Sequence, residues 1–128
     1  MIRQGQWLTA NFQHAAYDTI VFSMPLALKG QDLKQVANGA NDSMFKMLAR
    51  ALVSTGRGDD VVRLGWEFNL PAYPWSAIEQ PKAYANAFRR AVKAMRSVPG
   101  TEHLRFEWNF GRGGQPVNEL AYPGDEFV

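Results

Sequence analysis

The sequence contains no cysteine, which excludes disulfide bonds, thiolate metal sites and cysteine nucleophiles. No stretch approaches the ~20 consecutive apolar residues that span a bilayer, and the first residues lack the apolar region of a secretory signal. Lysine and arginine total 14 against 12 aspartate and glutamate, and no basic run concentrates them. These absences argue against a membrane-spanning protein and against a nucleic-acid-binding protein, which usually needs a concentrated basic patch.

Sequence signals for metal or cofactor binding are also lacking. The two histidines show no ligand-like spacing, and the Gly-rich segment 111–114 does not open a convincing helix as a phosphate loop would. We therefore expect neither a metal nor a cofactor, and nothing in the composition assigns a cellular compartment. What the chain does contain is 46% hydrophobic and 12% aromatic residues over a length of 128. This is enough for one domain with a hydrophobic core, and we expect a single domain over 1–128.

Apolar residues alternate along the chain between strand spacing and helix spacing. Stretches of β-branched and aromatic residues predict strands near 19–25, 61–69 and 103–109. Helical spacing predicts helices over 42–55 and 81–98, the second with a proline in its first turn. The order strand, helix, strand, helix, strand is typical of a parallel sheet with helical crossovers.

Three shorter segments complete the predicted organisation. We expect a helix-like stretch over 7–17, a turn at 122–125, and the lead-in to a fourth strand at 126–128. The second and third strands also repeat at a fixed interval, because position 105 follows position 63 by 42 residues. Arginine occupies both positions, so we expect Arg63 and Arg105 to be equivalent.

The charged residues of two predicted strands fall on one face. Side chains alternate along a strand, so one face is apolar and the other polar, with Arg63, Gly65, Glu67 and Asn69 opposite Val62, Leu64, Trp66 and Phe68. The next strand repeats this pattern, with Arg105, Glu107 and Asn109 opposite Leu104, Phe106 and Trp108. Burial on both faces, usual for parallel strands, would penalise these charges. A closed barrel removes the conflict because its inner face opens at the carboxyl rim, so we predict an α/β fold that is a section of a (β/α)₈ TIM barrel.

The polar face has more than one interpretation. In a barrel, Glu67, Asn69 and Asn109 would lie at strand ends, where catalytic groups are found, and deeper arginines would orient the carboxylates. One alternative is a purely structural ion-pair network inside the barrel, made of Arg63, Arg105, Glu67 and Glu107. Another alternative makes the strands antiparallel with one solvated face, although the helices predicted between them count against it.

The loop that follows the second strand is aromatic. It contains Tyr73 and Trp75 close to Glu67 in sequence. Flat aromatic faces beside a carboxylate suit a sugar-binding cleft, because the C–H faces of a pyranose stack on them. The alternative is that Trp75 only packs against the barrel end, and the sequence does not decide between the two.

Several motifs together resemble glycoside hydrolase family 26, the β-mannanase family. The first is Arg63-Leu64-Gly65-Trp66-Glu67-Phe68-Asn69 followed by Tyr73-Pro74-Trp75, which is similar to strand four of the family and its aromatic loop. Strand five is matched by Phe106-Glu107-Trp108-Asn109, the segment before strand six by 122–128, and the segment before helix three by 38–42. The resemblance covers about 19–128. It differs from the family at Trp66, where histidine is usual, and at Leu70, where glycine is usual.

The resemblance implies a function and a site. Glu67 would be the general acid/base of a retaining hydrolase that cleaves O-glycosyl bonds in a β-linked polysaccharide, with mannan-like substrates first. Substrate-binding residues would be Trp66, Asn69, Tyr73, Trp75 and Asn109, supported by Arg63, Arg105 and Glu107. The chain would span about strands three to five and the lead-in to strand six, and full-length relatives would be secreted or periplasmic. The nucleophile, expected on strand seven, is not in this sequence.

Two consequences follow from a partial barrel. This chain alone is expected to be catalytically silent, because a retaining hydrolase needs two carboxylates in register. Its open strand edges are expected to favour self-association. The competing functional class is a non-catalytic carbohydrate-binding or truncated structural form of such a barrel.

Overall fold

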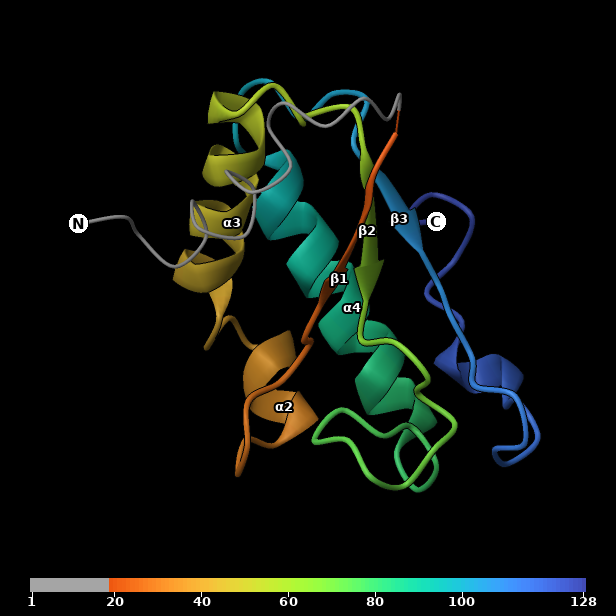
Figure 1. Ribbon diagram of the computed structural model, residues 1–128. Helices are drawn as coiled ribbons and strands as arrows, with labels where there is room; N and C mark the ends of the chain where they lie inside the picture. Colours follow the sequence, from red (N-terminus) through yellow and green to blue (C-terminus); the bar gives the residue numbers. More distant parts are fainter. Residues whose placement is uncertain (1–18) are drawn as a thin grey trace.

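The computed structural model describes residues 19–128 (Figure 1). In chain order its elements are β1 (Val21–Met24), α2 (Leu33–Ala37), α3 (Asp42–Ser54), β2 (Val61–Leu64), α4 (Pro81–Arg96), β3 (Arg105–Glu107) and a short 3₁₀ helix, η1 (Glu119–Ala121). The helix-like stretch expected over 7–17 lies outside the described residues. The two long helices lie where helical spacing predicts them, and α4 begins with Pro81 in its first turn.

The three strands form one parallel sheet in the order β1-β2-β3. Val21 is aligned with Val61, and Val61 in turn with Arg105. The prediction of a parallel α/β arrangement is therefore confirmed, and the antiparallel alternative is wrong. Because consecutive strands are parallel, the chain must return to the start of the sheet after β1 and again after β2, and it does so through helices.

The helices cover a single face of this sheet. Phe22, Met24, Val62, Leu64 and Phe106 are buried, whereas their strand neighbours Val21, Ser23 and Arg105 are exposed. The buried strand residues belong to the same core as the apolar stripes of α3 and α4, and the two helices pack against each other (Figure 1). The helix stripes are Phe45, Leu48 and Leu52 on α3 and Tyr84, Phe88, Val92 and Met95 on α4. Fully burying each such side chain contributes roughly 1.5–3 kcal/mol, so this face holds the sheet and the helices together.

The strands are shorter than the apolar alternation predicts. The predicted strand over 61–69 ends at Leu64, because Gly65 has φ 55° and Glu67 has φ 51°, both in the left-handed region. Likewise, β3 ends at Glu107, two residues before Asn109. The expectation that Glu67 and Asn69 share the polar strand face is therefore wrong: both residues lie in the loop that follows β2.

The register also differs from the 42-residue repeat seen in the sequence. Arg63 is aligned with Glu107, so Arg63 and Arg105 are not equivalent positions. Hydrogen bonds between facing backbones set the register, and a repeat of residue types along one chain does not report it.

Two short elements, α2 and η1, were not predicted. The five-residue helix α2 begins with a capping box. The Asp32 side chain accepts the Lys34 N–H, and the Gln35 side chain accepts the Asp32 N–H. At the other end, the turn lies at 125–127 and not at the predicted 122–125, and residues 126–128 contain no strand. Two arginines of α4 hold this terminal segment, since Arg89 donates to the Pro123 carbonyl and Arg96 to the Glu126 carbonyl, each at 2.7 Å.

Candidate functional site

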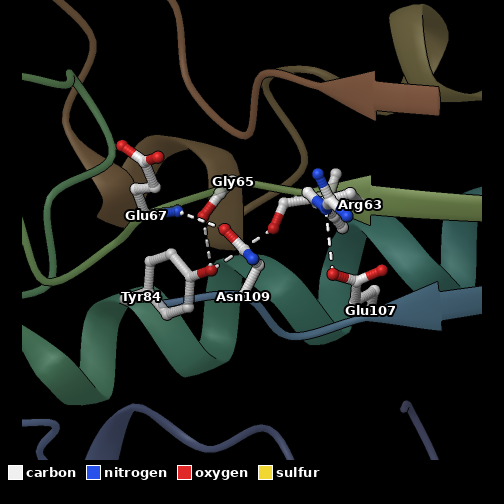
Figure 2. Close-up of polar contacts among 7 residues, drawn as sticks. Arg63, Gly65, Glu67, Tyr84, Glu107 and Asn109 are labelled. Carbon is white, nitrogen blue, oxygen red and sulfur yellow. Dashed lines mark hydrogen bonds and ion pairs between the residues drawn. The ribbon is translucent and has the colours of Figure 1, made fainter. Parts of the chain in front are cut away.

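The carboxyl end of β2 is anchored from below by helix α4. The buried Tyr84 hydroxyl donates to the Gly65 carbonyl at 2.9 Å and lies 3.4 Å from the Leu64 carbonyl (Figure 2). Burial raises the pKa of this hydroxyl well above its ordinary value, so it remains a proton donor across the physiological range. A Cβ on Gly65 would lie 3.1 Å from the Tyr84 hydroxyl and 3.0 Å from the Leu26 Cβ. The turn therefore requires glycine both for its φ and for this close approach.

Glu67 follows this turn in an unusual backbone conformation. Among residues 19–128 it is the only non-glycine residue with positive φ. Its backbone N–H donates to the Asn109 side-chain oxygen at 3.0 Å, which links the loop after β2 to the segment after β3 (Figure 2). A left-handed non-glycine residue costs of order 1–3 kcal/mol and persists only where its surroundings hold it, a pattern that clusters at functional sites.

The Glu67 carboxylate is half-buried and points away from the other charged residues. Figure 2 shows it directed away from Asn109 and well apart from the Arg63–Glu107 pair. The Tyr73 hydroxyl donates to its Oε2 at a long 3.4 Å. In the part of the chain that the structure describes, no ion pair neutralises Glu67. Within residues 19–128, the bond from Tyr73 is the one hydrogen bond that this carboxylate accepts.

The structural ion-pair interpretation is confirmed for two of its four residues. Arg63 Nε donates to Glu107 Oε1 at 2.9 Å across adjacent strands, and both side chains are about one third exposed. Arg105 is exposed and, within residues 19–128, belongs to no ion pair. The four-residue network is therefore wrong, and Glu107 is occupied by Arg63 on the open face of the sheet.

Asn69 is an anchor for the glycine-rich loop. It is 5% exposed, its Nδ2 donates to the carbonyls of Gly111 and Gln115 at 3.0 Å each, and its Oδ1 accepts the Gly111 N–H at 2.6 Å. Both N–H groups and the oxygen of its amide thus bond the loop over 111–115 and not a solvent-exposed surface. A hollow of ≈150 Å³ borders Asn69 and Phe68, and Glu67 does not line it.

The three aromatic side chains around Glu67 form one cluster. Trp75 is 4% exposed, stacks on Tyr73 at 4.8 Å between ring centroids, and donates its indole N–H to the Trp66 carbonyl at 2.8 Å. Trp66 meets both rings edge-on. Trp75 is therefore a buried member of this cluster, while the half-buried Trp66 and Tyr73 retain partly exposed rings.

Three residues that shape this site were not predicted from the sequence: Gly65, Tyr84 and Gly111. A glycine inside a strand pattern is a signal for a bulge or a close approach, and it could have marked Gly65 as the end of β2. Tyr84 carries no such signal, because its spacing on α4 is that of an ordinary core residue. Gly111 looks like one of several glycines in a loop.

The comparisons with known proteins add no family. No protein-family model matches the chain, and no curated sequence is similar to it. Over residues 19–128, no helix has both the length and the apolar character needed to cross a membrane. The same residues contain no cluster of three or more histidine, aspartate or glutamate side chains that could hold a metal ion.

Proposed function

We propose that this chain carries the acid/base half of a retaining, β-mannanase-like glycoside hydrolase that cleaves a β-linked polysaccharide. The observation that carries the proposal is Glu67: a carboxylate without an ion-pair partner in residues 19–128, just past the carboxyl end of the middle parallel strand, on a left-handed backbone. Catalytic groups of parallel α/β proteins are found at this end of the strands. The resemblance of 63–75 to glycoside hydrolase family 26 suggests the reaction, which is general acid/base catalysis of glycoside hydrolysis.

The proposal includes a (β/α)₈ barrel of which this sheet would be one section. Three features support it: strands in sequence order, crossover helices packed together over one face, and a polar opposite face with the Arg63–Glu107 pair. A closed barrel would enclose that polar face. It would also pair the outer edges of β1 and β3, which have no strand partner in the described part of the chain and would otherwise favour self-association.

In the proposed reaction Glu67 donates a proton to the glycosidic oxygen as the C1–O bond breaks. A second carboxylate, about 5–5.5 Å away, would attack the anomeric carbon from the opposite side. Glu107 is unsuited to that role, because Arg63 binds it and because it belongs to the neighbouring strand, deeper than the loop that carries Glu67. The chain by itself is therefore expected to release no reducing sugar.

Azide can replace the missing nucleophile in a direct test. Purified chain would be incubated with a β-1,4-manno-oligosaccharide with and without sodium azide. Azide attack would form a C1–N bond while the C1–O bond breaks and the Glu67 proton moves to the leaving oxygen, giving an α-glycosyl azide and a shortened oligosaccharide. We expect this product only with azide, and about 10²- to 10⁴-fold less of it from Glu67→Gln.

Glu79→Gln provides the matched control, because Glu79 is exposed in the same loop region. It should match the unmodified chain. Equal azide product from Glu67→Gln, or none from any variant, would contradict the catalytic proposal. Saturable quenching of tryptophan fluorescence by the oligosaccharide without azide product would favour the non-catalytic carbohydrate-binding alternative.

A further inference from the structure

We propose that Asn109 and Gly111, in the segment after β3, are positioning residues that fix the direction of the Glu67 carboxylate. The inference rests on the proposed function, since it assigns how the acid/base is held. It also changes the role expected for Asn109 from a contact with sugar to a contact with Glu67. Asn109 acts on the backbone of Glu67 and Gly111 on its side chain.

The contact from Asn109 stabilises the strained backbone of Glu67. The Asn109 Oδ1 accepts the Glu67 N–H at 3.0 Å, and the residue that donates this N–H is the one with φ 51°. Without the acceptor, a partly buried N–H would lose its partner and the left-handed conformation would lose a restraint. A change of φ at Glu67 would redirect the whole side chain, because the Cα–Cβ bond turns with the backbone.

Gly111 leaves room for the Glu67 side chain. A Cβ at position 111 would lie 3.2 Å from Glu67 Cγ, 3.3 Å from Glu67 Cβ and 3.1 Å from Leu70 Cδ1. Gly111 is not among the glycines with positive φ, so its backbone does not require glycine. The requirement for glycine comes from the space that neighbouring side chains occupy. A side chain at position 111 would press against the Cβ and Cγ atoms of Glu67.

Gly111 cannot move away to relieve such a contact, because Asn69 holds it on both sides. The Asn69 amide accepts the Gly111 N–H at 2.6 Å and donates to the Gly111 carbonyl at 3.0 Å. Asn69 is 5% exposed and also holds the Gln115 carbonyl. The segment 109–111 is therefore a fixed surface against which Glu67 is placed.

The test combines three substitutions at two positions with a matched control. Asn109→Ala removes the acceptor, and Asn109→Asp keeps an oxygen in its place. Gly111→Ala adds the intruding methyl group. Gly113→Ala is the control, because a Cβ at Gly113 has nothing within 4 Å although the residue lies in the same loop. Its φ of +79° makes this substitution strain the loop without touching Glu67.

The first readout is independent of activity. We expect Asn109→Ala to accelerate hydrogen exchange of the Glu67 amide at least 10-fold relative to the amide of Phe88 in α4, and Asn109→Asp to restore its protection. We expect Gly111→Ala, but not Gly113→Ala, to shift the NMR signals of the Glu67 γ-methylene group. Unchanged exchange in Asn109→Ala, or unchanged signals in Gly111→Ala, would overturn the proposal.

The second readout is azide-dependent cleavage. We expect kcat to fall by about 10²-fold in Asn109→Ala and Gly111→Ala, with KM within 2-fold, because displacing a reacting group by about 1 Å has an effect of this size. A rise in KM at constant kcat would overturn the positioning role in favour of direct sugar binding. If the unmodified chain gives no azide product, the proposed function fails, and the exchange and NMR data still decide whether these residues hold Glu67.

Discussion

The two ends of β2 are built differently. Before the strand, Arg57 and Asp60 form an ion pair at 3.3 Å whose side chains are only 9% and 7% exposed. The Asp60 carbonyl accepts the Arg105 N–H at 3.1 Å, which joins this end to β3. Gly58 approaches so closely that a Cβ there would lie 2.6 Å from the Gly100 carbonyl oxygen. The charges of Arg57 and Asp60 are thus paired and almost fully buried.

After the strand, the chain presents a carboxylate instead of burying one. Glu67 is half-buried and has no ion-pair partner within residues 19–128. It occupies a left-handed conformation, in which Asn109 accepts its N–H and Tyr84 donates to the Gly65 carbonyl. The amino end of β2 is therefore held by a buried ion pair, whereas its carboxyl end carries a residue in a strained backbone conformation. In barrels, the amino end serves stability and the carboxyl end serves chemistry.

The largest expected effect is at the amino end. Asp60→Ala removes the carboxylate of the buried Arg57–Asp60 ion pair, and breaking one side of a buried pair typically costs about 3–5 kcal/mol. We expect a loss of this size in the free energy of unfolding, measured by urea denaturation. Asp59→Ala, an exposed neighbour, should change stability by less than about 0.5 kcal/mol. Equal effects at the two positions would remove the distinction between the two ends of β2.

The next effect concerns the support below the carboxyl end. Tyr84→Phe keeps the ring and removes the hydroxyl that donates to the Gly65 carbonyl, so a buried acceptor loses its partner. We expect a loss of about 1–3 kcal/mol in the free energy of unfolding. The Glu67 amide should exchange faster than the amides of α4, because the turn that precedes it loosens.

The same variant tests the pH dependence. Burial raises the pKa of Tyr84, so the folded protein keeps a proton that the unfolded chain releases above about pH 10. The contribution of Tyr84 to the free energy of unfolding should be fully present below that pH. Above it, this contribution should fall by up to about 1.4 kcal/mol per pH unit. Tyr84→Phe should have a flatter alkaline profile, and an identical slope in both proteins would contradict the assignment.

A smaller effect of opposite sign is expected at Glu67 itself. Glu67→Gly removes the side chain that makes positive φ unfavourable, so the free energy of unfolding should rise by about 1 kcal/mol. Glu79→Gly, at an exposed position with ordinary φ, should lower stability instead, because glycine makes the unfolded chain more flexible. Destabilisation by both variants would mean that the carboxyl end stores no strain.

The smallest effect is expected far from both ends of β2, where Arg90 of α4 donates to Asp42 at the start of α3 at 2.7 Å. The hydrogen bond from Arg90 holds the pKa of Asp42 below its usual range. The pair therefore stabilises the fold above about pH 4 and ceases to do so as the pH falls through the lowered pKa. Asp42→Asn should cost less than about 1 kcal/mol at neutral pH, because the arginine is 44% exposed and screened by solvent.

The acid profile checks this last expectation. Asp42→Asn should lose less stability between pH 5 and pH 2 than the unmodified chain, whereas Asp59→Asn should follow the unmodified chain. A profile unchanged by Asp42→Asn would show that the pair contributes nothing measurable.

The amino-acid pattern was sufficient to predict the two long helices, the centres of the three strands and their order. The observed limits of α3 and α4 lie within two residues of the predicted ones. This agreement arises because the buried face of a helix requires apolar residues at a regular local spacing. Strand, helix and strand in alternation were enough to predict a parallel sheet. Local signals are weakest for short elements. The only sequence signal for the five-residue helix α2 is its capping box, formed by Asp32 and Gln35.

The geometry around Glu67, in contrast, depends on contacts between segments that are distant in the sequence. The alternation of residue types continues through Asn69, yet the backbone leaves the strand after Leu64 with a left-handed φ at Gly65, where Tyr84 and Leu26 lie too close for a side chain. Register pairs Arg63 with Glu107, which a repeat of 42 residues does not report. These features depend on hydrogen bonds and close contacts between segments roughly 20 to 45 residues apart. Such contacts form between facing surfaces, and the spacing of residues within either segment does not specify them.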